Sequence, residues 1–143
     1  ELYMVWIIRL FLLIMFVTYF GIGVWAILSP LFAALDIELP SITEYIGLSI
    51  SSVIGYSELA GIYGGLNLAV GVLCLMGMFS LNYMSKALRL LMFLTGSIAL
   101  GRILFAVLPS TPTFINTFFL FEVTTFTFCL VALLLFKPLK KAA

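Results

Sequence analysis

The stretch LAGIYGGLNLAVGVLCLMGMF, Leu59–Phe79, contains no charged side chain. An α-helix crosses the hydrocarbon core of a bilayer with about 20 mostly apolar residues, so this stretch predicts a membrane-spanning helix. The whole chain has the same character, because 64% of its 143 residues are hydrophobic and only 9% are charged. Soluble domains have about 45–50% apolar and about 25% charged residues. The composition therefore predicts that lipid, rather than water, surrounds the chain.

Three further runs have the length and apolar character of membrane helices. The four predicted spans are residues 3–28, 59–79, 87–108 and 114–136. The first run lacks the basic start of a signal peptide and exceeds its usual apolar length, so we interpret it as a span. Pro30 and Pro138 are expected to end the first and fourth runs, and residues 80–86 and 109–113 to form turns. The predicted fold is an all-α membrane protein, a four-transmembrane-helix bundle in a single domain, residues 1–143.

The connection between the first two spans carries a helical signal of its own. Apolar residues recur at near-helical spacing from Ile42 to Ile54. Ser41 followed by Glu44 is typical of a capping box at a helix start. We expect a short amphipathic helix over about residues 41–55, on the outer membrane surface or folded over the bundle. The alternative is an ordered loop with an apolar underside.

The distribution of charge predicts an orientation. With four spans, one side carries Lys86, Arg89, Lys137, Lys140 and Lys141, and the other carries Asp36, Glu38, Glu44 and Glu58. The positive-inside rule then places both termini in the cytoplasm. The net charge of +1 gives no indication of a nucleic-acid partner. The expected partners are the lipid bilayer and other membrane protein subunits.

The sequence offers no recognisable catalytic or metal-binding constellation. Histidine is absent, which removes the commonest metal ligand and the easiest proton shuttle near neutral pH. Cys74 and Cys129 each lie in an apolar run, where buried free cysteine is the ordinary interpretation. No P-loop, Rossmann, HExxH or GxSxG pattern occurs. We expect no enzyme activity, no metal and no cofactor, with a bound quinone or lipid as the exception.

Four polar residues are expected at a similar depth in the outer half of the membrane. They are Glu58 at the mouth of the second span, Asn67, Arg102 and Glu122. An isolated charge in hydrocarbon costs at least about 2.5–3.5 kcal/mol, so Glu122 is the natural partner of Arg102. In one interpretation this pair clamps the third span to the fourth. In the other, the layer lines a cavity that binds a polar headgroup or small ligand.

Small residues mark two helix faces for close packing. Gly61, Gly65 and Ala69 form a small-xxx-small stripe that Gly64 widens. Ser97 and Gly101 form a similar notch on the third span, just before Arg102. These faces are expected to pack within the monomer or, alternatively, against another subunit.

The segments SELAGIYGGLNLAVGVLCLMG (residues 57–77) and GSIALGRILF (residues 96–105), together with a glutamate in the last span, resemble a known family. It is a domain-of-unknown-function family of small bacterial four-span membrane proteins, similar in outline to the DoxX-like group. The matching residues are Glu58, Tyr63, Gly64, Gly65, Gly101, Arg102 and Glu122. Ser57 stands where the family usually has asparagine, and an arginine expected near Ala60–Gly61 is missing. The resemblance implies the four-span fold and a bacterial inner membrane.

Three functions are compatible with these features. The first is a non-catalytic accessory subunit packed against a larger membrane complex. The second is a quinone- or lipid-binding subunit of a membrane redox system that uses the polar layer. The third is a small transporter, which the absence of a recognisable inverted repeat or broken helix disfavours.

Overall fold

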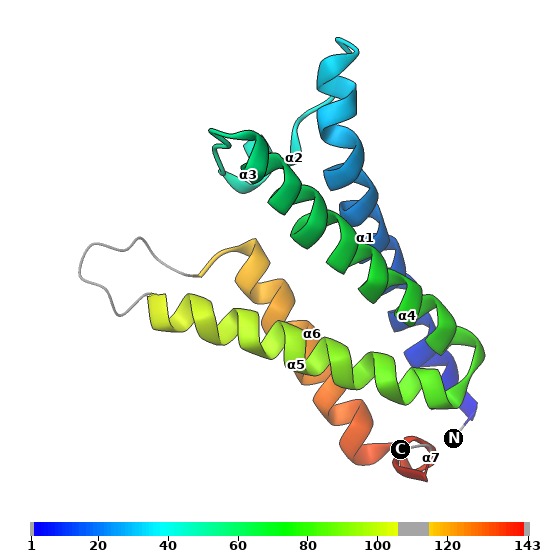
Figure 1. Cartoon of the computed structure of the whole chain (residues 1–143). Helices are drawn as coiled ribbons and strands as arrows, with labels where there is room; N and C mark the ends of the chain where they lie inside the picture. Colours follow the sequence, from blue (N-terminus) through cyan, green and yellow to red (C-terminus); the bar gives the residue numbers. More distant parts are fainter. Residues whose placement is uncertain (1, 106–114, 142–143) are drawn as a thin grey trace. The chain divides into compact units, whose positions relative to one another are not determined.

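The computed structural model describes residues 2–105 and 115–141, apart from the side chains of Ala33, Lys140 and Lys141. Helices make up nearly all of this part, and no strand occurs in it (Figure 1). Four helical segments are long and apolar enough to cross a membrane: Leu2–Phe32, Val53–Phe79, Leu81–Phe105 and Thr117–Leu135. The predicted all-α class with four membrane-length helices is confirmed, and these segments fit a multi-pass membrane protein.

Helix α1 spans Leu2–Ala34 and continues past residue 28, the predicted end of the first span. Pro30 lies inside the helix. A proline inside a helix removes one backbone donor and crowds the carbonyl four residues earlier, which disfavours helix but does not always end it. The expectation that Pro30 stops the first run was therefore wrong.

The connection after α1 folds back onto the end of that helix as two short helices, α2 (Ile42–Ile46) and α3 (Val53–Glu58). The single helix over residues 41–55 was wrong in its continuity, because Gly47 ends α2 with a left-handed φ of 72°. Glycine adopts this conformation without steric cost. The predicted N-cap is correct, since Ser41 Oγ accepts a hydrogen bond from the Thr43 amide at 3.3 Å.

A small apolar cluster attaches this connection to α1. Ile42, Ala26 and Leu59 are its buried members, and Trp25 packs against them. Trp25 Nε1 also donates to the Pro40 carbonyl at 2.9 Å. These contacts satisfy the indole N–H, which a buried or half-buried tryptophan needs, and hold α2 against α1.

The second membrane-length segment begins six residues before the predicted Leu59. It consists of α3, a π-helical segment η1 (Leu59–Leu66) and α4 (Asn67–Phe79). The side chain of Ser52 caps its start by accepting from the Gly55 amide at 3.2 Å. π-Helices usually appear as single-turn bulges, frequently at functional sites. An eight-residue π-helical segment is thus the unusual local feature of this chain.

The last two membrane-length helices are α5 (Leu81–Phe105) and α6 (Thr117–Leu135), followed by the short α7 (Lys137–Lys141). The predicted polar turn over residues 80–86 was wrong, since α5 starts at Leu81. This stretch contains neither glycine nor proline, and its polar side chains are compatible with helix. The predicted turn over residues 109–113 lies outside the described residues. Helix α6 ends before Pro138, as predicted.

The described chain divides into two compact units. Unit 1 contains residues 1–9 and 76–143, and unit 2 contains residues 10–75. Unit 1 thus holds the start of α1 together with α5, α6 and α7, and unit 2 holds the rest of α1 with α2, α3, η1 and most of α4. The single membrane domain stays a prediction.

Candidate functional site: the Arg102–Glu122 pair and the π-helical segment

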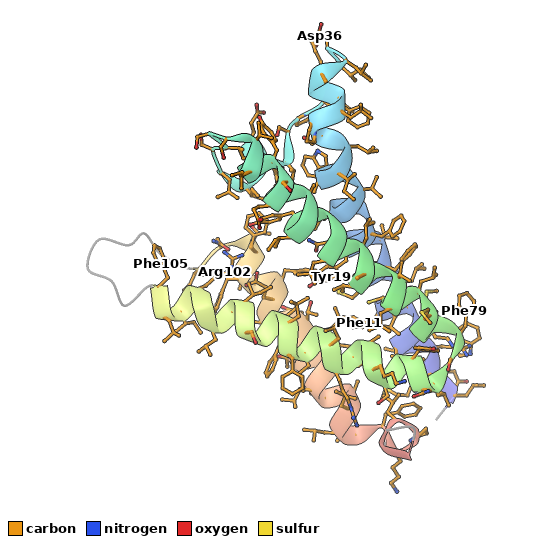
Figure 2. All side chains as sticks on the ribbon, viewed as in Figure 1. Phe11, Tyr19, Asp36, Phe79, Arg102 and Phe105 are labelled. Atoms are coloured by element: carbon orange, nitrogen blue, oxygen red, sulfur yellow. The ribbon has the colours of Figure 1, made fainter. Side chains whose placement is uncertain are left out.

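Arg102 and Glu122 form a two-point ion pair between α5 and α6 in unit 1. Arg102 Nε donates to Glu122 Oε2 at 2.8 Å, and Arg102 Nη2 donates to Oε1 at 2.9 Å. Arg102 lies three residues before the last described residue of α5, and Glu122 five residues after the start of α6. Figure 2 labels Arg102 near this end of α5. The pairing predicted from their similar depth is present.

The pair is partly shielded by its own unit. The Glu122 side chain is 9% exposed and that of Arg102 is 34% exposed. The guanidinium also lies over the Phe118 ring, with Cζ 5.7 Å from the ring centroid. A planar guanidinium matches a carboxylate at two points, and such charge-assisted bonds are stronger than neutral ones. The two charges therefore neutralise each other where lipid alone would solvate neither.

Below the ion pair, α5 and α6 meet along small and hydroxyl side chains. Thr95, Ala99, Thr125 and Cys129 are all buried. Thr95 Oγ1 donates to the Leu91 carbonyl at 2.6 Å, so its polar atom has a partner within α5. Small side chains allow two membrane helices to approach closely, which increases their van der Waals contact.

An open apolar groove of about 410 Å³ runs along one side of this helix pair. Its lining residues come from α5 and α6 and are Met92, Phe93, Gly96, Ser97, Ala99, Leu100, Ile103, Val123 and Phe126. Ser97 supplies the one hydroxyl among them. The volume falls within the usual range of about 300–1,000 Å³ for small-molecule sites. Such a groove fits an apolar tail better than a polar molecule.

The polar residues of the second span lie in unit 2. Glu58 is exposed at the end of α3, and Asn67 is half-buried at the start of α4. Asn67 Nδ2 donates to the Tyr63 carbonyl, inside η1, at 2.8 Å. The amide thereby supplies a donor to the backbone of the π-helical segment, where regular α-helical bonding is lost. We assign this role to Asn67, which the sequence analysis treated only as a member of a polar layer.

The predicted layer is divided between the two units. Arg102 and Glu122 belong to unit 1, whereas Glu58 and Asn67 belong to unit 2. The structure brings together the first two residues. That all four share one layer stays a prediction.

Close helix packing occurs at glycines, but mostly at other glycines than expected. In unit 2, a Cβ on Gly64 would lie 2.5 Å from Ile27 Cγ1, one on Gly23 would lie 2.8 Å from the Leu68 amide nitrogen, and one on Gly71 would lie 2.9 Å from the Phe20 amide nitrogen. At Gly23 and Gly71 the facing atoms include backbone, so a side chain would require the helices to move apart, whereas at Gly64 the Ile27 side chain would have to move. Gly64 was predicted to pack, whereas Gly23 and Gly71 were missed.

The stripe of Gly61, Gly65 and Ala69 is exposed and does not pack inside unit 2. Its packing within the monomer or against another subunit stays a prediction. A Cβ on Gly61 would meet nothing within 4 Å, and one on Gly65 only the Ala60 carbonyl oxygen at 3.9 Å. The spacing of four residues suits an α-helix, but the π-helical segment turns more slowly, so the spacing does not select one face.

A similar shift applies to the third span. Ser97 and Gly101 are exposed, and a Cβ on Gly101 would meet nothing within 4 Å. Gly96 is the glycine that packs, because its Cβ would lie 2.8 Å from Phe126 Cδ2. Gly96 and Ser97 are adjacent small residues, and the sequence alone does not indicate which of the two faces α6.

Cys74 and Cys129 are buried, as expected, and neither belongs to a disulfide. In the described part of the chain, no group of three or more His, Cys, Asp or Glu side chains is placed to hold a metal ion. The site that the described residues do provide is therefore an ion pair beside an apolar groove, with no cluster of titratable groups.

Comparison with known proteins places the chain in a family without naming an activity. Neither the curated proteins nor the solved structures contain a match. A family model, described as a domain of unknown function (DUF4345), matches residues 7–135. This match covers most of the chain and bears out the resemblance to a domain-of-unknown-function family, while the likeness to the DoxX-like group stays a prediction. The chain belongs to the DUF4345 family.

Proposed function

We propose that this protein is a non-catalytic accessory subunit that packs against a larger membrane complex through the exposed face of η1 and α4. The observation that carries the proposal is the open space at Gly61 and Gly65. We place the protein in a bacterial inner membrane with both termini in the cytoplasm, in keeping with the distribution of lysine and arginine.

Glycine inside a helix is unfavourable by about 1 kcal/mol relative to alanine. At Gly64 this cost is offset by contact with Ile27 in the same unit. At Gly61 no described residue lies near enough to benefit from the missing side chain. Because lipid tails do not require glycine either, a helix from another subunit is the neighbour that would exploit this surface.

Apolar side chains next to these glycines extend the same surface. Ile62, Tyr63 and Leu66 are exposed by 55%, 36% and 49%. A flat face of small residues bordered by large apolar ones suits close approach of a partner helix. Membrane helices gain association energy mainly from such packing, because lipid already solvates their apolar side chains.

The test is the variant Gly61→Leu, with Gly21→Leu as matched control. Gly21 is also exposed, and a Cβ on it would meet nothing within 4 Å. After extraction from native membranes in mild detergent, the unchanged protein and the Gly21→Leu variant are expected to migrate as part of a large complex. The Gly61→Leu variant is expected to migrate as a single chain without the complex. The free energy of unfolding of both purified variants should equal that of the unchanged protein.

Two results contradict the proposal. One is migration of the unchanged protein as a lone 15.8 kDa chain or as its own dimer. The other is loss of stability in purified Gly61→Leu, which would mean that the chain itself covers this face.

A quinone- or lipid-binding subunit is the second candidate, favoured by the groove between α5 and α6. Its lining is apolar apart from Ser97, as a prenyl or acyl tail requires. The variant Ser97→Phe is expected to fill the groove and to abolish co-purification of any tail-bearing molecule, whereas Ser80→Phe, outside the groove, should not.

A further inference from the structure

We propose that one end of unit 1 is a binding surface for the phosphate groups of anionic phospholipids. This end comprises the start of α1, the start of α5 and α7, and we call it the basic end. Its charged residues are Arg9, Lys86, Arg89 and Lys137, with Lys140 and Lys141 following in α7. In Figure 1 the start of α1 and the short α7 lie close to the junction of α4 and α5.

Among the described residues of the basic end, no acidic side chain compensates the basic charge. No aspartate or glutamate occurs in residues 2–9, 76–105 or 136–141. These are the described residues of unit 1 outside α6 and the two residues before it. Six of the seven basic residues of the chain lie here, and the seventh, Arg102, is paired with Glu122. The surface therefore complements an anionic partner.

Two of the basic side chains of this end lie over aromatic rings of their own helices. Arg9 Cζ lies 5.1 Å from the centroid of the Trp6 ring, and Lys86 Nζ lies 5.2 Å from that of Tyr83. In each pair the cation is three residues after the ring, so it leans toward the N-terminus of its helix. Tryptophan and tyrosine favour the level of the lipid headgroups. Both cations are therefore expected to lie at the level of the lipid headgroups.

Arg9 has an unfilled hydrogen-bonding requirement. Its Nε is buried and has no hydrogen-bond partner among the described residues, while the residue as a whole is only half-buried. A guanidinium carries five N–H donors, and leaving donors unmet is costly away from water. At the headgroup level, phosphate oxygens are the strongest acceptors available, and they match the planar fork of arginine.

Helix α7 packs against the rest of unit 1. Leu139 is fully buried, Phe136 is 4% exposed, and Ser85 Oγ donates to the Leu139 carbonyl at 3.4 Å. This anchor holds the lysines of α7 beside the start of α5. Several cations held together bind an anionic lipid surface more selectively than scattered ones, each contributing about 1 kcal/mol.

The test uses Trp6 as a local reporter. The full-length Trp25→Phe variant, whose remaining tryptophan is Trp6, is reconstituted in phosphatidylcholine vesicles with brominated phosphatidylglycerol or brominated phosphatidylcholine as quencher. We expect phosphatidylglycerol to bind beside Trp6 at least about five-fold more strongly, the equivalent of one cation. Adding Arg9→Gln and Arg89→Gln should lower the ratio, because it removes two of the six cations of the basic end, and 0.5 M salt should weaken it further.

Matched variants separate charge from folding and from position. Arg9→Lys keeps the charge and is expected to retain the preference, whereas the complementary Trp6→Phe variant reports from Trp25 and should show none. Neutralising Asp36 and Glu38 should leave the Trp6 ratio unchanged. A ratio of one in the Trp25→Phe protein, or a ratio that Arg9→Gln with Arg89→Gln leaves intact, would overturn the proposal.

Discussion

Helices α5 and α6 of unit 1 are joined by a buried ion pair, whereas α1 and the η1–α4 segment of unit 2 meet at glycines. In unit 1, Glu122 is the one buried carboxylate among the described residues, and Arg102 contacts it at two points. In unit 2, Gly23 and Gly71 bring one backbone to within van der Waals contact of the other. Lipid provides no hydrophobic drive between helices, so each pair relies on a different source of attraction.

The difference teaches which perturbations each pair tolerates. An ion pair in lipid depends on both partners, because a charge left without its partner is exposed to hydrocarbon, which does not stabilise it. A glycine contact depends on the absence of a methyl group, because the facing atoms are backbone and cannot rotate away. Charge changes should therefore affect unit 1, and volume changes should affect unit 2.

The largest expected effect is the loss of one ionic partner. Arg102→Met or Glu122→Leu alone removes one member of the two-point ion pair and leaves the other charge without it, which is expected to destabilise the protein by about 3–5 kcal/mol. The double variant should recover to within about 1 kcal/mol of the unchanged protein, because buried ion pairs are often replaceable by apolar residues. Unfolding by SDS titration in mixed micelles measures all three.

This cycle also distinguishes a structural clamp from a ligand site. A clamp predicts that the double variant regains both stability and assembly with the native complex. If stability returns but assembly or ligand retention does not, then the pair contacts something beyond α5 and α6.

The next largest effect is expected where glycine faces backbone. Gly23→Ala and Gly71→Ala should each destabilise the protein by about 1–3 kcal/mol, because the added methyl group would overlap Leu68 and Phe20 backbone atoms. Gly21→Ala, two residues from Gly23 with open space around it, should be neutral or up to about 1 kcal/mol stabilising through helix propensity. Equal effects at Gly21 and Gly23 in the same micelle assay would refute the packing explanation.

The spans and the ion pair could be predicted because lipid constrains them strongly. A run of about 20 apolar residues has one stable environment. The deep Arg102 needs a carboxylate, and Glu122 is the one acid within the last two spans. No comparable rule selects among glycines: Gly64 packs and Gly65 does not, although the two are adjacent. That choice depends on the local helical pitch and on the facing helix, neither of which a single sequence displays.

Local breaks were harder to predict for a related reason. Gly47 ends α2 and Pro30 does not end α1. Proline usually disrupts a helix more strongly than glycine does, yet here only the glycine ends one. In lipid an open backbone is costly, because no water satisfies its polar groups. This cost favours continued helix at Pro30, which belongs to a candidate span, while Gly47 lies in a connection between spans.

The smallest expected effect concerns the π-helical segment. Asn67→Leu keeps the branching of the side chain but removes the 2.8 Å hydrogen bond to the Tyr63 carbonyl, at an expected cost of about 0.5–1.5 kcal/mol. Faster amide hydrogen exchange should appear in η1, residues 59–66, and not in α5. Asn82→Leu, at an exposed position near the start of α5, is the control and should leave η1 unchanged. If exchange in η1 is insensitive to Asn67, then the wide turn is maintained by its glycines and its neighbours, and the comparison between the two helix pairs sharpens: unit 2 would depend on backbone shape alone, and unit 1 on paired charge.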